Sequence, residues 1–347
     1  MKMRKLGQTD LMVSELCLGT MTFGTQTPEA DAHTQLEVAL DGGINFLDAA
    51  EMYPVNPIRK ETIGRTEEIL GNWFAKTGRR NEWIVATKHS GAGMVHVRDG
   101  APISSKTIPA TVEGSLKRLQ TDHIDLYQLH WPNRGSYMFR QNWTYDPSSQ
   151  NRSDTLQDMA DVLGALEREI EKGRIRHIGL SNESAWGTAM WLRVAEETSG
   201  PRMQTIQNEY SLMCRLADTD LAELMVNEQV SLLPFSPLAA GLLTGKYQNG
   251  AVPANSRMAL NGDLGGRKSD RAFDAVEAYM KVAEDAGLDL ALMALAWSAQ
   301  RAFVASSIFG ATTTEQLRHL LKAADLTLTD DVLSAIDKAN RRHPMPF

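Results

Sequence analysis

The feature that most constrains the fold of this chain is an alternation, repeated eight times, between short apolar runs and longer amphipathic stretches. Short runs rich in β-branched and other apolar residues are typical of buried strands, and alternating strands and helices are typical of a parallel sheet. We expect strands at Leu16–Gly19, Asn45–Asp48, Ile84–Thr87, Leu126–Leu129, Ile178–Ser181, Thr205–Gln207, Leu232–Phe235 and Ser306–Phe309.

The segments between these runs have the residue spacing of amphipathic helices. Gly42–Gly43 and Gly173 follow helical runs, as glycines at helix C-termini do. The main helical patterns cover Asp31–Asp41, Thr66–Phe74, Ile108–Leu119 and Thr155–Glu171, and the end of the chain adds Thr314–Ala324 and Asp330–Ala339. A length of 347 residues allows one or two domains, but no linker divides the chain. We therefore predict an α/β fold, a single (β/α)8 TIM barrel over residues 1–347 with added C-terminal helices, rather than an open doubly wound sheet with a second domain.

Long polar segments and titratable residues follow the expected strands, and in a barrel both would meet at the C-terminal face, where substrates bind. The long segments are Pro54–Arg65, Ser90–Thr107, Pro132–Asp154 and Gln248–Asp270. Asp48 alone could be a helix cap, and Lys88 alone could be a surface charge, so it is the joint pattern that indicates an active site. The residues at the strand ends are Thr20, Asp48, Lys88, His130, Ser181, Asn182, Gln207, Ser236 and Thr312.

Composition and charge disfavour several other classes of protein. The net charge is −7 and no basic run occurs, so we do not expect nucleic acid as a partner. No apolar run approaches the length of a membrane span, and the start lacks a secretory signal. We therefore expect a cytoplasmic protein that does not bind membranes. The two cysteines, Cys17 and Cys214, are expected to be free thiols, and no His or Cys spacing indicates a metal site.

Two familiar nucleotide-binding motifs are also missing. The Gly-x-Gly-x-x-Gly fingerprint of a Rossmann dehydrogenase does not occur. The segment Gly241–Tyr247 is similar to a P-loop, but it has three residues rather than four between its glycines, and Tyr247 replaces the residue that would hold magnesium. We therefore reject an ATPase.

Four short motifs occur one after another along the first part of the chain: Leu18–Met21, Asp48–Tyr53, Ala86–Lys88 and Gln128–Pro132. In order and spacing they resemble those of the aldo-keto reductase superfamily, including its branch of potassium-channel β-subunit-like proteins, over nearly the whole chain. The resemblance implies a catalytic tetrad of Asp48, Tyr53, Lys88 and His130.

The residue types of this tetrad suit the reduction of a carbonyl group, which needs a hydride and a proton. Tyr53 is expected to be the proton donor, with its pKa lowered toward neutrality by the ammonium of Lys88. Asp48 would keep Lys88 protonated, and a neutral His130 would donate a hydrogen bond to the substrate oxygen. Without the other three residues, Tyr53 would be read as a loop aromatic and His130 as a core histidine.

The resemblance also implies a nicotinamide cofactor, NADP(H) or possibly NAD(H). Ser181, Asn182 and Gln207 match residues that bind the carboxamide, and Phe235 stands where an aromatic ring stacks on nicotinamide. Gln316, where many relatives carry Arg, and His319 and Leu320 depart from the family pattern, which leaves the preference for NADPH over NADH open. The full set of expected cofactor-binding residues is Gly19, Thr20, Met21, Ser181, Asn182, Gln207, Phe235, Ser236, Pro237, Leu238, Gly241, Lys246, Tyr247, Arg257, Gly310, Thr312 and Gln316.

The function that we predict is reversible NADPH-dependent reduction of an aldehyde or ketone, with a small carbonyl compound as the partner. Two alternatives stay open: a cofactor-sensing regulatory subunit with slow turnover, and a sugar or alcohol dehydrogenase that works in the oxidative direction. Trp131 is the expected substrate-binding residue, and further aromatics in Pro132–Asp154 indicate a mostly apolar pocket. These aromatics could equally pack on a neighbouring subunit, so the oligomeric state is open.

Overall fold

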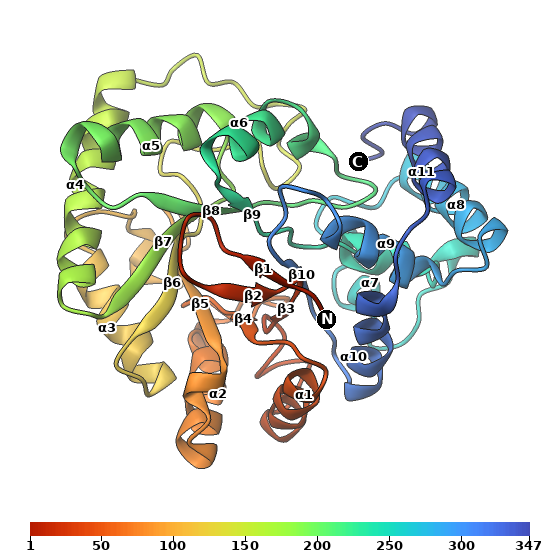
Figure 1. Ribbon diagram of the computed structural model, residues 1–347, viewed down its shortest axis with the longest axis horizontal. Coiled ribbons are helices and arrows are strands. Elements are labelled where there is room, and N and C mark those ends of the chain that lie inside the picture. The colour runs from red at the N-terminus through yellow and green to blue at the C-terminus, as the bar shows by residue number, and fades with distance from the viewer.

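Eight parallel strands form one sheet in the order β10-β3-β4-β5-β6-β7-β8-β9 in the computed structural model, which describes all residues 1–347 (Figure 1). The pairing between neighbours in this order is parallel throughout. The strands are β3 Leu16–Gly19, β4 Phe46–Asp48, β5 Ile84–His89, β6 Ile124–Leu129, β7 Ile175–Ser181, β8 Met203–Gln207, β9 Ser231–Leu232 and β10 Ser307–Phe309. All eight expected strands are thus present.

The two edges of this sheet meet and close the barrel. The main-chain N–H of Ala305 donates to the carbonyl of Leu232 at 3.0 Å, and that of Ile308 donates to the carbonyl of Pro234 at 2.8 Å. Strand β9 is shorter than the expected Leu232–Phe235 because Pro234 has no N–H group to pair with a neighbour. The predicted (β/α)8 barrel is confirmed.

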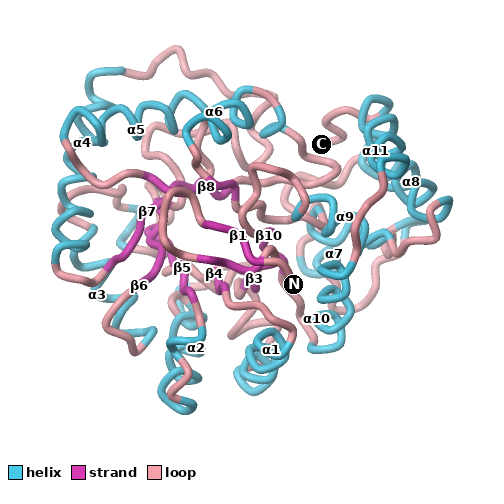
Figure 2. Tube along the Cα trace, viewed as in Figure 1, coloured by secondary structure: helices cyan, strands magenta, loops and turns pink.

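Helices surround the strands on all sides, as the tube view shows (Figure 2). The α-helices are α1 Glu29–Asp41, α2 Arg65–Thr77, α3 Ile108–Leu119, α4 Arg152–Glu171, α5 Ala185–Thr198, α6 Asp220–Glu228, α7 Arg257–Leu260, α8 Asp270–Asp285, α9 Leu290–Ala299, α10 Thr314–Leu321 and α11 Asp330–Arg342. Short 3-10 helices are η1 Lys60–Thr62, η2 Arg80–Glu82, η3 Arg98–Gly100, η4 Leu216–Asp218, η5 Ala239–Thr244, η6 Gln248–Gly250 and η7 Lys322–Asp325. Helices α8 and α11 pack together beside the barrel, and no helix combines the length and apolarity needed to cross a membrane.

Polar side chains before the helices fix where several of them begin. The side chain of Asn151 accepts hydrogen bonds from two main-chain N–H groups in the first turn of α4, and Ser184 accepts one in α5. Thr313 does the same for α10. These caps set the start of each helix after the preceding strand, following a long loop for α4 and a short one for α5 and α10.

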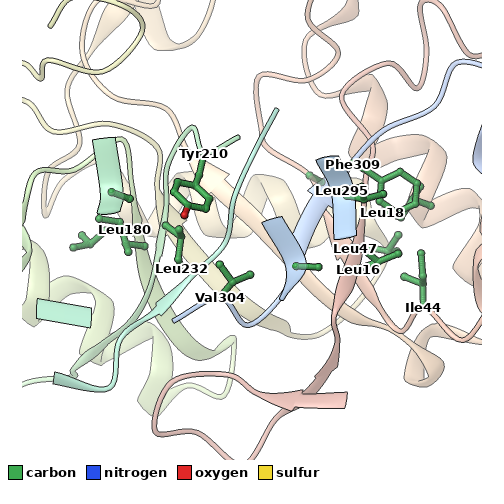
Figure 3. Packing of buried hydrophobic residues seen from close by; sticks show 14 of the residues in the cluster. Leu16, Leu18, Ile44, Leu47, Leu180, Tyr210, Leu232, Leu295, Val304 and Phe309 are labelled. Carbon is green, nitrogen blue, oxygen red and sulfur yellow. The ribbon is translucent and has the colours of Figure 1, made fainter. Parts of the chain in front are cut away.

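Alternate side chains on the strands enter two different apolar clusters, as expected for a period of two. The larger cluster lies between strands and helices and includes Leu16, Leu18 and Leu47 (Figure 3). The smaller cluster fills the barrel interior, with Cys17, Phe46, Ala86 and Leu126 from four adjacent strands. Both cysteines, Cys17 and Cys214, are free and buried.

An antiparallel hairpin that the sequence did not reveal closes the N-terminal end of the barrel. Its strands, β1 Met3–Lys5 and β2 Met12–Ser14, have only three residues each, too few for a recognisable alternation. Leu6, Leu11 and Val13 from this hairpin join the interior cluster. The barrel is therefore filled with apolar side chains at this end, and its polar interior lies at the opposite one.

Candidate active site

Polar side chains inside the barrel follow the apolar interior residues at a spacing of two. Asp48 comes two residues after Phe46, and Lys88 comes two residues after Ala86. Since side chains two apart on a strand share a face, both point into the barrel at its C-terminal end. Their side chains meet there: Nζ of Lys88 lies 2.7 Å from Oδ2 of Asp48, and both side chains are almost completely buried.

The ammonium of Lys88 has three polar neighbours. It donates to Asp48, to the carbonyl of Ala49 at 2.7 Å and to the hydroxyl of Tyr53 at 3.5 Å. Burial alone would lower the pKa of Lys88, but Asp48 and Tyr53 favour the charged form and raise it above its ordinary value. Lys88 is therefore a buried cation at neutral pH.

Tyr53 lies on the loop that follows β4, with its hydroxyl group next to Lys88. Its main chain is fixed by hydrogen bonds to Ala50 at 3.0 Å and from Thr66 at 3.3 Å. Burial raises the pKa of Tyr53 above its ordinary value, although Lys88 acts in the opposite direction. The expected lowering does not occur in the protein alone, because burial outweighs the effect of Lys88 and the charge of Asp48 adds to the effect of burial. Tyr53 is therefore protonated at neutral pH, as a proton donor must be.

His130, which follows β6, is the fourth residue of this group. Its ring is 5.9 Å from the ring of Tyr53 between centroids, and its Nδ1 is buried without a hydrogen-bond partner. Burial lowers the pKa of His130 well below its ordinary value, and Lys88 and His89 add to the effect. A neutral imidazole beside Tyr53 can bind the oxygen of a small molecule.

Trp131 lies beside His130 and forms one wall of the space next to Tyr53 and His130, which we call the catalytic opening. Its ring lies 4.9 Å from that of His130 and 6.3 Å from that of Phe139, between centroids. The indole N–H donates to the carbonyl of Ala92 at 3.0 Å. A Cβ atom at Gly91 would overlap with the indole, so the close approach of Trp131 requires glycine there.

The three residues expected to bind an amide lie together beside the tetrad. The hydroxyl of Ser181 donates to the carbonyl of Gln207 at 2.9 Å, and the side-chain amide of Asn182 donates to the carbonyl of His130 at 2.9 Å. Oδ1 of Asn182 is buried without a partner. The backbone of Asn182 is left-handed, with φ of 54°. This unpaired acceptor suits an amide N–H₂ group of a ligand.

Gln128 and Gln207 surround Asp48 from two further strands. Nε2 of Gln207 donates to Oδ1 of Asp48 at 2.8 Å, and Nε2 of Gln128 approaches the same atom at 3.4 Å. The sequence indicates for Gln207 only a role toward the cofactor, and it indicates no role for Gln128. Its position two residues after Leu126 is the signal that could have placed Gln128 in the interior.

A second group of residues expected to bind the cofactor extends from the loop after β9, through η5, to the start of α7. Phe235, Ser236 and Leu238 are partly exposed, whereas Pro237 is buried. Nζ of Lys246 lies over the ring of Tyr247, 5.2 Å from its centroid, and next to Gly241, whose φ is +94°. Arg257 is half-buried and has no acidic partner, and burial lowers its pKa. This is a cationic surface free to meet an anion.

The strand ends of β3 and β10 bring Thr20 and Gly310 to the same face. The hydroxyl of Thr20 donates to the main-chain carbonyl of Asp48 at 2.8 Å, and the main-chain carbonyl of Met21 accepts from Val55 at 3.0 Å. Gly19 and Gly310 are in close contact across the two strands.

The start of α10 departs from a simple anion site. The side-chain oxygen of Gln316 accepts from the main-chain N–H and the hydroxyl of Thr312, both at 3.0 Å. His319 lies 3.4 Å from Asp289, and Leu320 is buried in the core. These two residues therefore face other parts of the protein.

A buried ion triad that the sequence did not reveal connects three loops next to the opening. Glu209, after β8, accepts from Arg140 at 2.7 Å and from Arg267 at 2.6 Å. The two arginines lower the pKa of Glu209, against the effect of burial. The partners are distant in sequence, and nothing in their local patterns indicates the contact.

Comparison with known proteins places this arrangement in a family. A sequence model described as "Aldo/keto reductase family" matches residues 15–341. The chain is 43% identical to "Protein tas" of Escherichia coli (strain K12), over all of this chain and 99% of that protein. It is 33% identical to "Uncharacterized oxidoreductase YrpG" of Bacillus subtilis, over 96% of this chain and 94% of that protein.

A third relative has a name of a different kind. The chain is 32% identical to "Probable voltage-gated potassium channel subunit beta" of Arabidopsis thaliana, over 99% of this chain and 98% of that protein. The family match and the relative named as an oxidoreductase support an oxidoreductase. On the match across 15–341 and these near full-length identities, the chain belongs to the aldo/keto reductase family.

Proposed function

We propose that this protein reduces an aldehyde or ketone to the alcohol with NADPH, reversibly, and that Tyr53 donates the proton. The observation that carries this proposal is the placement of a protonated Tyr53 hydroxyl 3.5 Å from the buried ammonium of Lys88, beside a neutral His130. Family membership supports the same reaction class.

The roles of the four residues follow from their charges. As the carbonyl oxygen gains negative charge, Tyr53 transfers its proton to it, and the phenolate that remains is stabilised by the ammonium of Lys88. Asp48 keeps that ammonium protonated throughout. His130 orients the oxygen by a hydrogen bond, which a neutral ring can donate from one nitrogen. In the oxidative direction, the same groups would accept the proton from the alcohol.

The residues present fit a nicotinamide dinucleotide phosphate. A bound reduced nicotinamide would supply the hydride. The buried, unpaired Oδ1 of Asn182, with Ser181 and Gln207, would hold its carboxamide, and Phe235 would stack against the ring. Lys246 and Arg257, which have no acidic partners, would hold the adenosine 2′-phosphate that NADPH has and NADH lacks, and their positive charges favour NADPH.

The test is consumption of NADPH by the purified protein with a panel of activated aldehydes and ketones, with NADH in parallel and Tyr53→Phe beside the wild type. We expect Tyr53→Phe to bind NADPH normally but to lose about 100-fold or more in rate. Arg257→Met should weaken NADPH binding about tenfold and leave NADH binding unchanged, whereas the exposed Lys268→Met serves as the charge-matched control. Full activity in Tyr53→Phe would exclude it as the proton donor.

A second candidate function is a subunit that binds the cofactor tightly and turns over slowly. Similarity over nearly the full length to a protein named as a probable potassium channel subunit favours it. The rate of cofactor release distinguishes the two, because catalysis requires exchange at least as fast as turnover. If NADPH binds and is released slowly, and if none of the carbonyl compounds causes its consumption, this second function is the better account.

A further inference from the structure

A cavity of about 230 Å³ lies outside the barrel wall, behind the ends of β6 and β7. Leu129 and Leu180 are register partners on these strands and form its inner wall. Gln128, directly before Leu129, approaches Asp48 inside the barrel, so the alternation of strand side chains turns Leu129 outwards. The two strands therefore lie between the cavity and the barrel interior, although Ser181 at the end of β7 and Trp131 after β6 line the cavity as well.

Helix α4 forms the outer wall of the cavity with one of its faces. Asp154, Asp158 and Val162 are spaced four residues apart, so they lie one above the other along the helix. Val162 and Trp191 of the neighbouring α5 are buried and supply apolar surface, while Asp154 is exposed at the start of the helix. The cavity thus has an apolar interior and a carboxylate-lined side.

The charges around the cavity do not balance. Arg134 is already paired with Glu183 by two hydrogen bonds, one of 2.9 Å. Asp158 accepts one hydrogen bond, from the amide of Asn133 at 3.0 Å, and no basic side chain pairs with Asp158 or Asp154. Burial raises the pKa of Asp158, with a contribution from Asp161. A cation in the cavity would balance the excess negative charge and favour the charged form of Asp158.

We propose that this cavity is a second binding site, which takes a small organic cation made of a protonated amine and one ring or a short alkyl body. The amine would pair with Asp158, and the body would lie against Val162 and Trp191. Cavities of about 150 Å³ accept benzene, so the volume here is sufficient for a ring with a short substituent. An anion is disfavoured by the two carboxylates, and Asn151 already caps the N-terminal N–H groups of α4.

Trp131 connects this site to the catalytic opening. It lines the cavity, and its ring lies 4.9 Å from that of His130. Displacement of the indole by a ligand would alter the surroundings of His130 without filling the space of the carbonyl compound. A bound amine should therefore change the rate of carbonyl reduction without competing with the substrate; this last effect rests on the proposed function, whereas binding itself does not.

Isothermal titration calorimetry of the full chain at pH 7.5 tests the proposal, with benzylamine as the probe and benzyl alcohol as its neutral counterpart. We expect benzylamine to bind at least tenfold more tightly than benzyl alcohol. Asp158→Asn keeps an acceptor for Asn133 and should weaken benzylamine about tenfold, to the level of the alcohol. Glu167→Gln, an exposed charge change on the same helix, should have no effect.

A second variant tests the location independently of charge. Val162→Phe places a ring in the cavity and should abolish binding of both probes, with a cooperative unfolding transition as the check that the protein is folded. The proposal is wrong if benzylamine gives no binding heat with the wild type, if benzyl alcohol binds equally well, or if Asp158→Asn and Glu167→Gln bind it alike. Binding without any carbonyl reduction would overturn the proposed function and leave this site standing.

Discussion

The side-chain amide of Gln207 donates to Oδ1 of Asp48 at 2.8 Å, across the interior of the barrel. Asp48 uses its other oxygen for Lys88, so both of its oxygens are engaged in the same buried network. Residues 159 positions apart in the chain thus connect the proposed amide-binding group with the proposed proton donor. Changes at Gln207 should therefore affect stability and cofactor binding together.

Gln207→Leu removes a hydrogen bond to a buried carboxylate and should lower the free energy of unfolding by about 2 kcal/mol. It should also weaken NADPH binding, since Gln207 is expected to hold the carboxamide. Gln128→Leu is the matched control, because Gln128 approaches the same oxygen only at 3.4 Å and has no proposed contact with the cofactor. Urea denaturation and a cofactor titration measure both quantities; equal effects of the two variants on cofactor affinity would contradict the role of Gln207.

The ion pair between Lys88 and Asp48 gives a prediction in which stability and activity separate. Lys88→Met leaves the carboxylate of Asp48 buried without its cation and should destabilise the protein by about 3–5 kcal/mol. The double variant Asp48→Asn with Lys88→Met removes both charges and should recover most of that loss. Both variants should remain far slower than the wild type in the proposed carbonyl reduction. Recovery of the rate in the double variant would show that the ammonium is not needed for the chemistry.

Buried His89 predicts how stability depends on pH. Burial and the charge of Arg98 lower the pKa of His89 to about 3 in the folded protein, although a hydrogen bond to Ser90 acts in the opposite direction. In the unfolded chain a histidine titrates near 6.5, so below about pH 6.5 the unfolded state binds a proton that the folded state does not. Stability should therefore fall on acidification, by roughly 2 kcal/mol from this residue between pH 6.5 and 5.

His89→Gln checks this by removing one titrating group. Between pH 6.5 and 5, the unfolding free energy of this variant should depend less steeply on pH than that of the wild type. The difference in slope should correspond to the uptake of close to one proton fewer on unfolding. His130, whose pKa is also lowered, contributes a slope of the same sign that the variant retains. An unchanged slope in His89→Gln would mean that His89 is not neutral in the folded state.

A substitution at Gly91 should change the shape of the catalytic opening. A side chain at this position overlaps with the indole of Trp131, so Gly91→Ala should displace Trp131 and alter KM for bulky carbonyl compounds more than for small ones. Gly93→Ala, in the same loop and with free space around it, is the comparison for general loop effects, although its φ of +89° makes some loss of stability expected. Steady-state kinetics with a small and a large aldehyde separate the two, and identical KM ratios in wild type and Gly91→Ala would contradict the prediction.

The sequence predicted the parts of the structure that depend on local pattern. The eight strands and the barrel follow from periodicity, and the meeting of Asp48 and Lys88 at the C-terminal face follows from their positions at strand ends. The hairpin β1–β2 was missed because three residues are too short to show a period.

Contacts that depend on packing between distant loops could not be predicted. Glu209 meets Arg140 and Arg267 only because three loops converge at one face, and none of these loops has a regular pattern. The direction of the Tyr53 pKa was also missed, because burial and the charge of Asp48 are properties of the assembled site. The cavity behind β6 and β7 is likewise a property of packing.

The closure of the barrel has a consequence for how the protein is made. Every strand pairing except that of β10 with β3 joins strands that follow one another in the chain, so the sheet can grow strand by strand as the polypeptide leaves the ribosome. Until residues 307–309 emerge, however, β3 and β9 both present unpaired main-chain groups. A nascent chain that stalls before this point would expose two edges able to pair with other chains, and it is in this interval of synthesis that the protein most needs protection from aggregation.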